Sequence, residues 1–145
     1  MGISRIMVVD DDPDDRDLFA AAASQATAPV AVRFASDGLD ALQQLKSDAG
    51  SDIELLLLDV NMPAMDGWET LTRLKRNVSL REIPVIMFST SSAISDIEKA
   101  ARLGAVAFIS KPSCFDHIIQ LVRMITALPD GNAAKTLHGF APGAN

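Results

Sequence analysis

The sequence predicts an α/β fold, a doubly wound (βα)5 domain in which five parallel strands alternate with five helices. Its 145 residues fit one ordinary domain. Five apolar runs of four to six residues lie about 20 to 30 positions apart, and segments with helical spacing of apolar residues fill the gaps. Runs that are apolar throughout suit strands covered by helices on both faces, as in a parallel sheet.

The apolar runs are the predicted strands. Four of them are almost continuously apolar, whereas in the second Val and Phe alternate with Ala31, Arg33 and Ala35, which is typical of a half-exposed strand. The predicted strands are residues 5–9, 30–35, 55–58, 85–88 and 105–109.

Helix signals lie between the strands. Asp12 followed by Pro13 fits an N-cap and a first helical position, and residues 95–98 resemble a capping box that ends at Gly104. Residues 113–116 could cap the last helix. The side chains expected to face inward are Leu18, Phe19 and Ala22, then Leu39, Leu42 and Leu45, then Trp68, Leu71 and Leu74, and finally Phe115, Ile118, Ile119, Val122 and Ile125.

Residues 1–128 form the predicted domain, and residues 129–145 are expected to be a flexible C-terminal tail, because the pattern lapses after Leu128. The longest uncharged stretch has 15 residues, 18–32, which is shorter than the roughly 20 that a membrane span needs. The single cysteine, Cys114, cannot form an internal disulfide, and no apolar leader opens the sequence. The expected location is therefore the cytoplasm.

The acidity of the chain is local. The net charge is −6, from 13 basic and 19 acidic residues, and residues 10–17 alone contain six acids and one base. The remainder is nearly balanced, with 12 bases and 13 acids. A net-acidic chain without a basic stripe is a poor candidate for binding nucleic acid, so no such partner is expected.

Polar residues follow four of the five predicted strands. Asp10 and Asp11 follow the first, Asp59 the third, Ser89 the fourth and Lys111 the fifth. Since ligands of open α/β sheets bind at the carboxyl ends of the strands, we expect these side chains to meet there. Three neighbouring carboxylates repel one another, and a hard divalent cation such as Mg²⁺ relieves that repulsion.

The group could handle a phosphoryl group. Asp59, after an all-leucine strand, is the best-placed nucleophile, because carboxylates form acyl phosphates. Lys111 can neutralise phosphoryl charge and the Ser89 hydroxyl can donate to a phosphoryl oxygen. Each feature alone has a plain structural explanation, such as a helix start for the acids at 10–12 or a turn for the Ser-Thr pair. Their joint occurrence at four strand ends favours the functional interpretation.

On these residues the chain resembles a response-regulator receiver domain of the CheY-like family, the phosphoaccepting half of two-component signalling. The resemblance runs from about Arg5 to Leu128 and implies a flavodoxin-like sheet with strand order 2-1-3-4-5. The first helix and the segment after the fourth strand are similar to single-domain regulators paired with bacterial phytochromes. The motifs that carry the resemblance are residues 6–11, 57–63, 65–67, 85–89 and 108–112.

The resemblance implies a donor, an acceptor and a metal site. Asp59 would accept the phosphoryl group from a phosphohistidine of a sensor histidine kinase or a phosphotransfer protein. Mg²⁺ would be held by the side chains of Asp11 and Asp59 and by the backbone carbonyl of Asn61, with Asp10 acting mainly through water.

The remaining motif positions have implied roles as well. Lys111 would pair with the phosphate, and Pro112 would follow a cis bond. The Ser89 hydroxyl would be drawn toward the phosphoryl group as the switch aromatic, here Phe108 without a phenol hydroxyl, turns inward. Asp12 is a third acid beyond the usual pair and is assigned to capping, the alternative being that it alters the metal ligand set.

The signalling surface expected to change lies in residues 92–128, the fourth helix, fifth strand and fifth helix, which would meet a downstream protein or form a homodimer through the two helices. The chain is not expected to be an enzyme beyond its own phosphorylation and dephosphorylation. One alternative is a Mg²⁺-dependent phosphohydrolase with an aspartyl nucleophile, although such enzymes place a second Asp where this chain has Asn61. Another is a pseudo-receiver that binds its partners constitutively.

Overall fold

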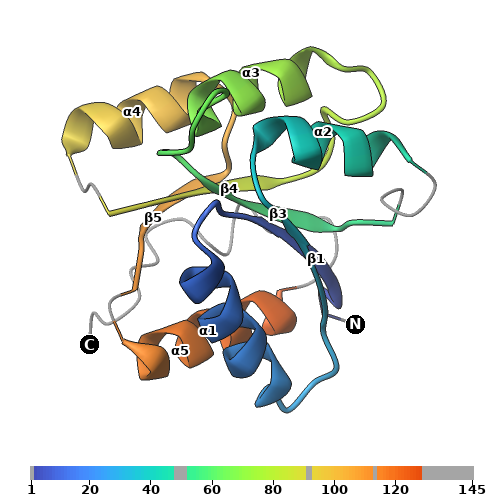
Figure 1. The fold of residues 1–145 in the computed structure, drawn as a ribbon, viewed down its shortest axis with the longest axis vertical. Helices are drawn as coiled ribbons and strands as arrows, with labels where there is room; N and C mark the ends of the chain where they lie inside the picture. Colours follow the sequence, from blue (N-terminus) through green and yellow to red (C-terminus); the bar gives the residue numbers. More distant parts are fainter. Residues whose placement is uncertain (1, 48–51, 91–92, 113, 129–145) are drawn as a thin grey trace.

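The computed structural model describes residues 2–47, 52–90, 93–112 and 114–128. In these segments five parallel strands alternate with five helices, and the strand order is β2-β1-β3-β4-β5, which confirms the predicted flavodoxin-like (βα)5 fold (Figure 1). The elements are β1 (Arg5–Val9), α1 (Pro13–Ser24), β2 (Ala31–Ala35), α2 (Gly38–Lys46), β3 (Leu55–Asp59), α3 (Gly67–Arg76), β4 (Val85–Ser89), α4 (Ile94–Arg102), β5 (Ala107–Ser110) and α5 (Phe115–Ala127).

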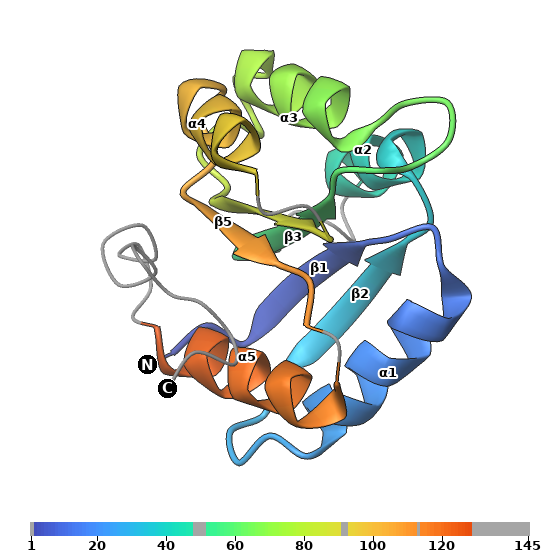
Figure 2. The same cartoon turned by 90° about the vertical axis from the view of Figure 1, so that its left-hand side faces the viewer.

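The sheet lies between two layers of helices. Figure 2 shows α1 and α5 on one face and α2, α3 and α4 on the other. Alternate strand residues enter the two cores: Ile6 and Val8 pack with α1 and α5, whereas Met7 and Val9 pack with the other three helices. Residues 55–58 are fully buried, because both faces of β3 are covered. Burial on both faces explains why a run of four leucines forms a strand here.

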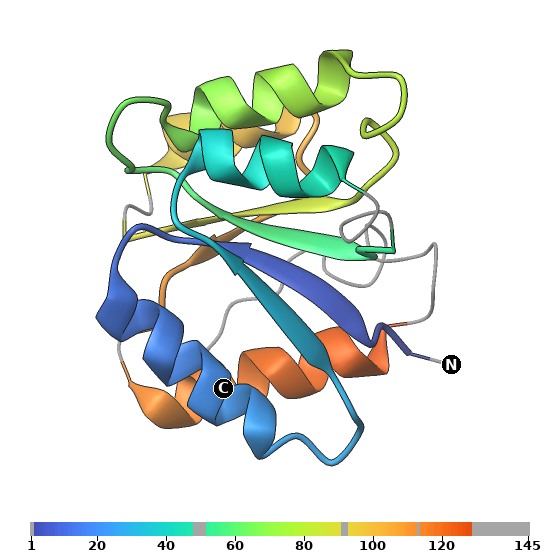
Figure 3. The same ribbon diagram turned by 45° about the vertical axis from the view of Figure 1, so that its right-hand side comes forward.

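The strand at the β2 edge of the sheet is half exposed, as predicted. Of the strands that the structure describes, only β1 pairs with it, and β1 lies beside it in Figure 3. Val32 and Phe34 are partly buried, whereas Ala31 and Arg33 are exposed. The alternation of the sequence therefore predicts the exposure of residues 31–34, whereas Ala35, expected on the exposed side, is buried.

The helix ends follow the predicted signals in part. Asp12 caps α1, where its side chain accepts a hydrogen bond from the Asp14 N–H, and Pro13 occupies the first helical position. The predicted capping box at residues 95–98 is wrong. The helix α4 begins at Ile94, two residues earlier than a cap at Ser95 would place it, so Ser95 already lies inside its first turn, and the N-cap residue Ala93 makes no side-chain cap. The helix α5 follows Cys114 without a side-chain cap either, and residue 113 lies outside the described residues.

The predicted stop at Gly104 is confirmed. Gly104 has φ of 101°, its N–H donates to the Ala101 carbonyl, and the Ala105 N–H donates to the Ala100 carbonyl. These two bonds form the Schellman arrangement that ends many helices. Because Ala105 takes part in it, β5 begins at Ala107, two residues later than predicted.

Two of the leucines predicted to face inward point outward. Leu18 is 45% exposed and Leu39 is 53% exposed, because their helical neighbours occupy the buried stripes. Trp68, Phe115 and Ile119 are only partly buried. The predicted core positions that are confirmed are Phe19, Ala22, Leu42, Leu45, Leu71, Leu74, Ile118, Val122 and Ile125.

The last described residues close the domain onto its beginning. The Ile3 N–H donates to the carbonyl of Leu128, and both side chains are buried in the core beside α5. The tail predicted for residues 129–145 lies outside the described residues. Among the described residues, none of the helices combines the length and the apolar composition that a membrane crossing requires.

Candidate functional site

The carboxyl ends of four strands bring the predicted site residues together. In the sheet register Asp59 is paired with Phe88 and Ser89 with Ser110, and Asp10 follows β1 directly. Parallel strands in register end at the same side of a sheet, so the residues that end or follow β1, β3, β4 and β5 form one group. The expectation that the side chains of Asp10, Asp11, Asp59 and Lys111 meet at this end is confirmed, and Ser89 ends a strand at the same edge.

Three carboxylates form the acidic part of the site. Oxygen atoms of Asp10, Asp11 and Asp59 all lie within 4.8 Å of one another. Asp10 is 2% exposed and Asp59 is 5% exposed, whereas Asp11 is open to solvent. Two buried acids beside a third, solvent-facing one can hold a divalent cation that approaches from the solvent side.

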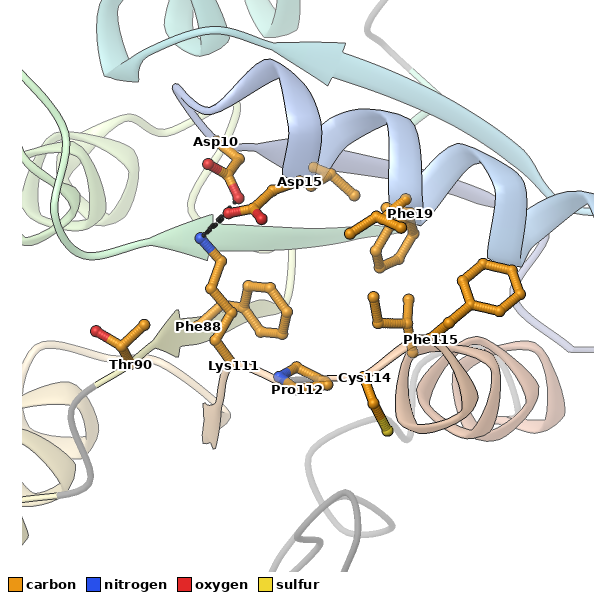
Figure 4. A pocket seen from close by; sticks show the side chains of 12 residues that line it. Asp10, Asp15, Phe19, Phe88, Thr90, Lys111, Pro112, Cys114 and Phe115 are labelled. Atoms are coloured by element: carbon orange, nitrogen blue, oxygen red, sulfur yellow. Dashed lines mark ion pairs between the residues drawn. The ribbon is translucent and has the colours of Figure 1, made fainter.

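Lys111, which directly follows β5, joins these acids at the carboxyl end of the sheet. Its Nζ lies 2.8 Å from Oδ2 of Asp10, 2.8 Å from Oδ2 of Asp15 and 3.3 Å from Oδ2 of Asp59. Figure 4 shows the ammonium pointing between the carboxylates of Asp10 and Asp15. The predicted proximity of Lys111 to Asp59 is thus confirmed.

Burial and charge shift the pKa values of these groups. Burial raises the pKa of Asp10 and of Asp59 above the ordinary value, and the ammonium of Lys111 offsets only part of that effect. Burial by itself would lower the pKa of Lys111. Its hydrogen bonds with Asp10 and Asp15 and the charge of Asp59 outweigh burial, and they raise the pKa of this lysine. The site therefore keeps its ammonium charged, and it favours any further cation near the two buried acids.

Backbone N–H groups orient the buried carboxylates. The Asp12 N–H donates to Oδ1 of Asp10 at 3.0 Å, and the Asn61 N–H donates to Oδ1 of Asp59 at 3.3 Å. In each pair Oδ1 accepts the backbone bond and Oδ2 faces Lys111. The Asp12 carboxylate itself caps α1, as predicted.

Close packing of the loop after β3 fixes the position of Asp59. The Gly67 N–H donates to the carbonyl of Val60 at 2.8 Å, and a Cβ at Gly67 would collide with the backbone carbonyl oxygen of Asp59. Only glycine allows α3 to start this close to the strand end. Asp66 caps that helix by accepting a hydrogen bond from the Glu69 N–H.

The last two strands carry the predicted switch residues. Ser89 is fully buried at the end of β4, and its carbonyl accepts a 2.7 Å hydrogen bond from the Lys111 N–H. Phe108 is partly buried against the core beneath α2, α3 and α4. The expected cis bond before Pro112 is wrong: the described residues contain no cis peptide bond, and the trans form is the one an X-Pro bond ordinarily prefers.

An apolar cavity of about 330 Å³ adjoins the site between α1, the end of β4 and the start of α5 (Figure 4). Asp10, Asp15 and Lys111 form its polar wall. The other lining residues are Val8, Leu18, Phe19, Phe88, Thr90, Pro112, Cys114, Phe115 and Ile118.

Sequence reasoning did not find Asp15. It is one of the six acids of residues 10–17, and its carboxylate contacts Lys111 as closely as that of Asp10 does. No local pattern separates Asp15 from its neighbour Asp14, because the orientation of α1 against the sheet decides which of the two carboxylates reaches Lys111.

The comparisons with known proteins agree with this geometry. The family profile of the response regulator receiver domain matches residues 6–123. The chain belongs to this family. Among its relatives is a protein-glutamate methylesterase/protein-glutamine glutaminase of Dechloromonas aromatica, to which the chain is 40% identical over 144 residues. This match covers 94% of this chain and 39% of that protein.

Two solved structures similar to this receiver domain are phytochrome regulators. The phosphorylated cyanobacterial phytochrome response regulator RcpA is 29% identical, with a TM-score of 0.72 over 84% of this chain and 90% of that one. The bacteriophytochrome response regulator AtBRR is also 29% identical, with a TM-score of 0.69 over 89% and 96% of the two chains. The chain spans between 19% and 63% of the length of the first curated relatives it matches.

Proposed function

We propose that Asp59 of this receiver domain accepts a phosphoryl group from a phosphohistidine of a sensor histidine kinase or a phosphotransfer protein, with Mg²⁺ as cofactor. One observation carries the proposal: the Asp59 carboxylate lies in contact with the Lys111 ammonium and within 4.8 Å of the oxygens of Asp10 and Asp11. A nucleophile, a cation and a place for a metal ion are thus adjacent. The similarity to RcpA, a regulator described as phosphorylated, supports the same chemistry.

The acidic group fits a divalent cation. Burial raises the pKa of Asp10 and Asp59, so a second positive charge would stabilise their ionised forms. Asp11 and Asp59 would bind the ion directly, Asp10 mainly through water, and the Asn61 backbone carbonyl would add one more oxygen. Bound Mg²⁺ would neutralise the oxygens of the incoming phosphoryl group.

The chain's own residues account for the transfer step. A carboxylate oxygen of Asp59 attacks phosphorus in line with the phosphorus–nitrogen bond of the donor. That bond breaks, its electron pair stays on the imidazole nitrogen, and an aspartyl phosphate forms. The Lys111 ammonium and the Ser89 hydroxyl then bind phosphoryl oxygens, in a position where burial strengthens both interactions.

The signal would leave through the surface formed by α4, β5 and α5, within residues 92–128. Movement of the Ser89 hydroxyl toward the phosphoryl group would let Phe108 turn inward and change this surface. Ile94 is 73% exposed and Ile97 is 44% exposed on α4, where they offer apolar contacts to a downstream protein or to a second copy in a homodimer. We place this function in residues 1–128 and in a reducing cytoplasm, which suits the single thiol.

Labelling with acetyl phosphate tests the proposal. With Mg²⁺ present, intact-mass spectrometry should show one added phosphoryl group on the wild-type protein and none on D59N. D14N is the matched control, because Asp14 is exposed and makes no ion pair among the described residues, and it should label normally. Full labelling of D59N would refute the assignment. Continuous release of inorganic phosphate over many turnovers would indicate the phosphohydrolase instead, and no labelling of the wild type would indicate the constitutive scaffold.

A further inference from the structure

We infer that Asp15 is a positioning residue that competes with the phosphoryl group for the ammonium of Lys111. The inference rests on the proposed role of Asp59 as the phosphoacceptor. It gives the first turn of α1 a part in setting how readily the domain is phosphorylated.

Asp15 is bound to the lysine as closely as any acid of the site. Its Oδ2 lies 2.8 Å from Nζ of Lys111, equal to the distance from Asp10 and shorter than the 3.3 Å from Asp59. In Figure 4 the side chain of Lys111 extends to the start of α1 and ends between two carboxylates. The ion pair therefore links helix α1 to the loop after β5.

The first turn of α1 is fixed in this position by its own contacts. Asp12 accepts a 2.9 Å hydrogen bond from the Asp14 N–H and caps the helix. The Arg16 guanidinium donates to the backbone carbonyl of Asp10 at 2.7 Å. These two bonds hold the turn against the end of β1, so the carboxylate of Asp15 stays within reach of the ammonium.

The competition follows from the number of donors. An ammonium has three N–H groups, and three carboxylates already surround that of Lys111. Phosphoryl oxygens on Asp59 would be additional acceptors, so the ammonium must release one of its present partners to reach them. The Asp15 side chain is 36% exposed, against 2% for Asp10, so water can solvate it best when it is released.

Removal of this charge should therefore favour phosphorylation. In D15N the amide binds the ammonium less strongly than the carboxylate, and one negative charge near the incoming phosphoryl group disappears. We expect labelling by acetyl phosphate to be about two- to five-fold faster than in the wild type, which corresponds to the loss of one partly exposed ion pair. The phosphorylated form should also persist longer.

Two variants distinguish the effect of the Asp15–Lys111 ion pair from the effect of any negative charge in the same helical turn. D14N removes the same charge from the same helical turn, but Asp14 is exposed and forms no ion pair with Lys111 in the described part of the chain. Its labelling rate should stay at the wild-type value. D15E restores the charge on a longer side chain and should return the rate to the wild-type value. The D15N effect should persist at 0.5 M salt, since salt screens distant charges more than contacts between partly buried groups.

Equilibrium binding of beryllofluoride, a phosphoryl analogue, gives a second measurement. With Mg²⁺ present, D15N should bind it about two- to five-fold more tightly than the wild type does, as followed by Trp68 fluorescence. D15N rates equal to those of D14N, or slower than the wild type, would overturn the inference. An unlabelled wild type would instead show that Asp59 is not a phosphoacceptor and would remove the basis of both proposals.

Discussion

Two half-buried lysines lie at opposite ends of the sheet and are held in opposite ways. Lys111 follows β5 at the carboxyl end, where three carboxylates surround its ammonium. Lys75 lies in the last turn of α3, near the amino end of β4, and donates to the backbone carbonyls of Arg81 at 3.0 Å and Ile83 at 3.1 Å. One lysine thus has charged partners and the other has neutral ones.

The pKa values of the two lysines shift in opposite directions. Burial lowers the pKa of Lys75, and the nearby Glu82 offsets only part of that effect. Burial would also lower the pKa of Lys111, but the hydrogen bonds with Asp10 and Asp15 raise it above the ordinary value. Similar burial therefore has different consequences. Lys75 binds the backbone of the loop that precedes β4, whereas Lys111 belongs to a charged cluster of the kind found at functional sites.

The largest expected effect is the loss of phosphorylation in K111M. Without the ammonium, none of the described residues would place a cation against Asp59 to neutralise the phosphoryl oxygens, so labelling by acetyl phosphate should be about 100-fold slower. K75M removes the other half-buried lysine and should label at the wild-type rate. Initial rates from intact-mass spectrometry measure both variants. Equal slowing in the two would mean that net charge, and not the position of Lys111, controls the reaction.

The second prediction concerns stability without a divalent cation. In K111M the buried carboxylates of Asp10 and Asp59 would repel each other unpaired, so the free energy of unfolding should fall by about 3 kcal/mol. Mg²⁺ should recover most of this loss, because it replaces the missing charge and binds only the folded state. Urea unfolding with and without Mg²⁺ measures the difference. A loss that Mg²⁺ leaves unchanged would show that the cation does not bind between these acids.

The fold and the strand-end residues could be predicted from the sequence because each depends on short-range patterns. Five apolar runs indicate the strands, and the residue after a buried strand must lie at its carboxyl end. Asp10, Asp59 and Lys111 could therefore be placed together without any side-chain geometry. The parallel register aligns the ends of neighbouring strands and so brings these residues to the same edge of the sheet.

What the sequence missed depends on helix rotation and on packing. Asp15 and Asp14 are adjacent acids in the same turn, and only the orientation of α1 against the sheet decides which one contacts Lys111. The exposed side chain of Leu39 is a similar case, since its spacing fits the buried stripe of α2. At α4 the pattern at Ser95 suggested a cap, but the helix begins after Ala93. Local residue patterns do not determine these orientations.

The third prediction uses pH to test the environment of Lys75. Its pKa is lower in the folded protein than in the unfolded chain, where it has the ordinary value of 10.5. Between those two values the unfolded chain binds more protons at this residue, so its contribution to stability rises as pH rises. The free energy of unfolding of the wild type relative to K75M should therefore increase with pH up to about 10.5, by less than the loss expected for K111M. A flat or falling difference in urea unfolding would show that the two carbonyls fully compensate for burial.

The smallest expected effect concerns a third lysine, Lys99 of α4, whose Nζ lies 4.7 Å from the centre of the Trp68 ring on α3. This lysine has an aromatic partner, and K99M should reduce the free energy of unfolding by only about 0.5 to 1 kcal/mol. The pair connects α3, which begins beside Asp59, to the proposed signalling surface. If phosphorylation shifts α4, beryllofluoride should change Trp68 emission in the wild type, and the change should be smaller in K99M. An identical response in both proteins would mean that Trp68 reports the site directly, and that α4 does not move relative to α3.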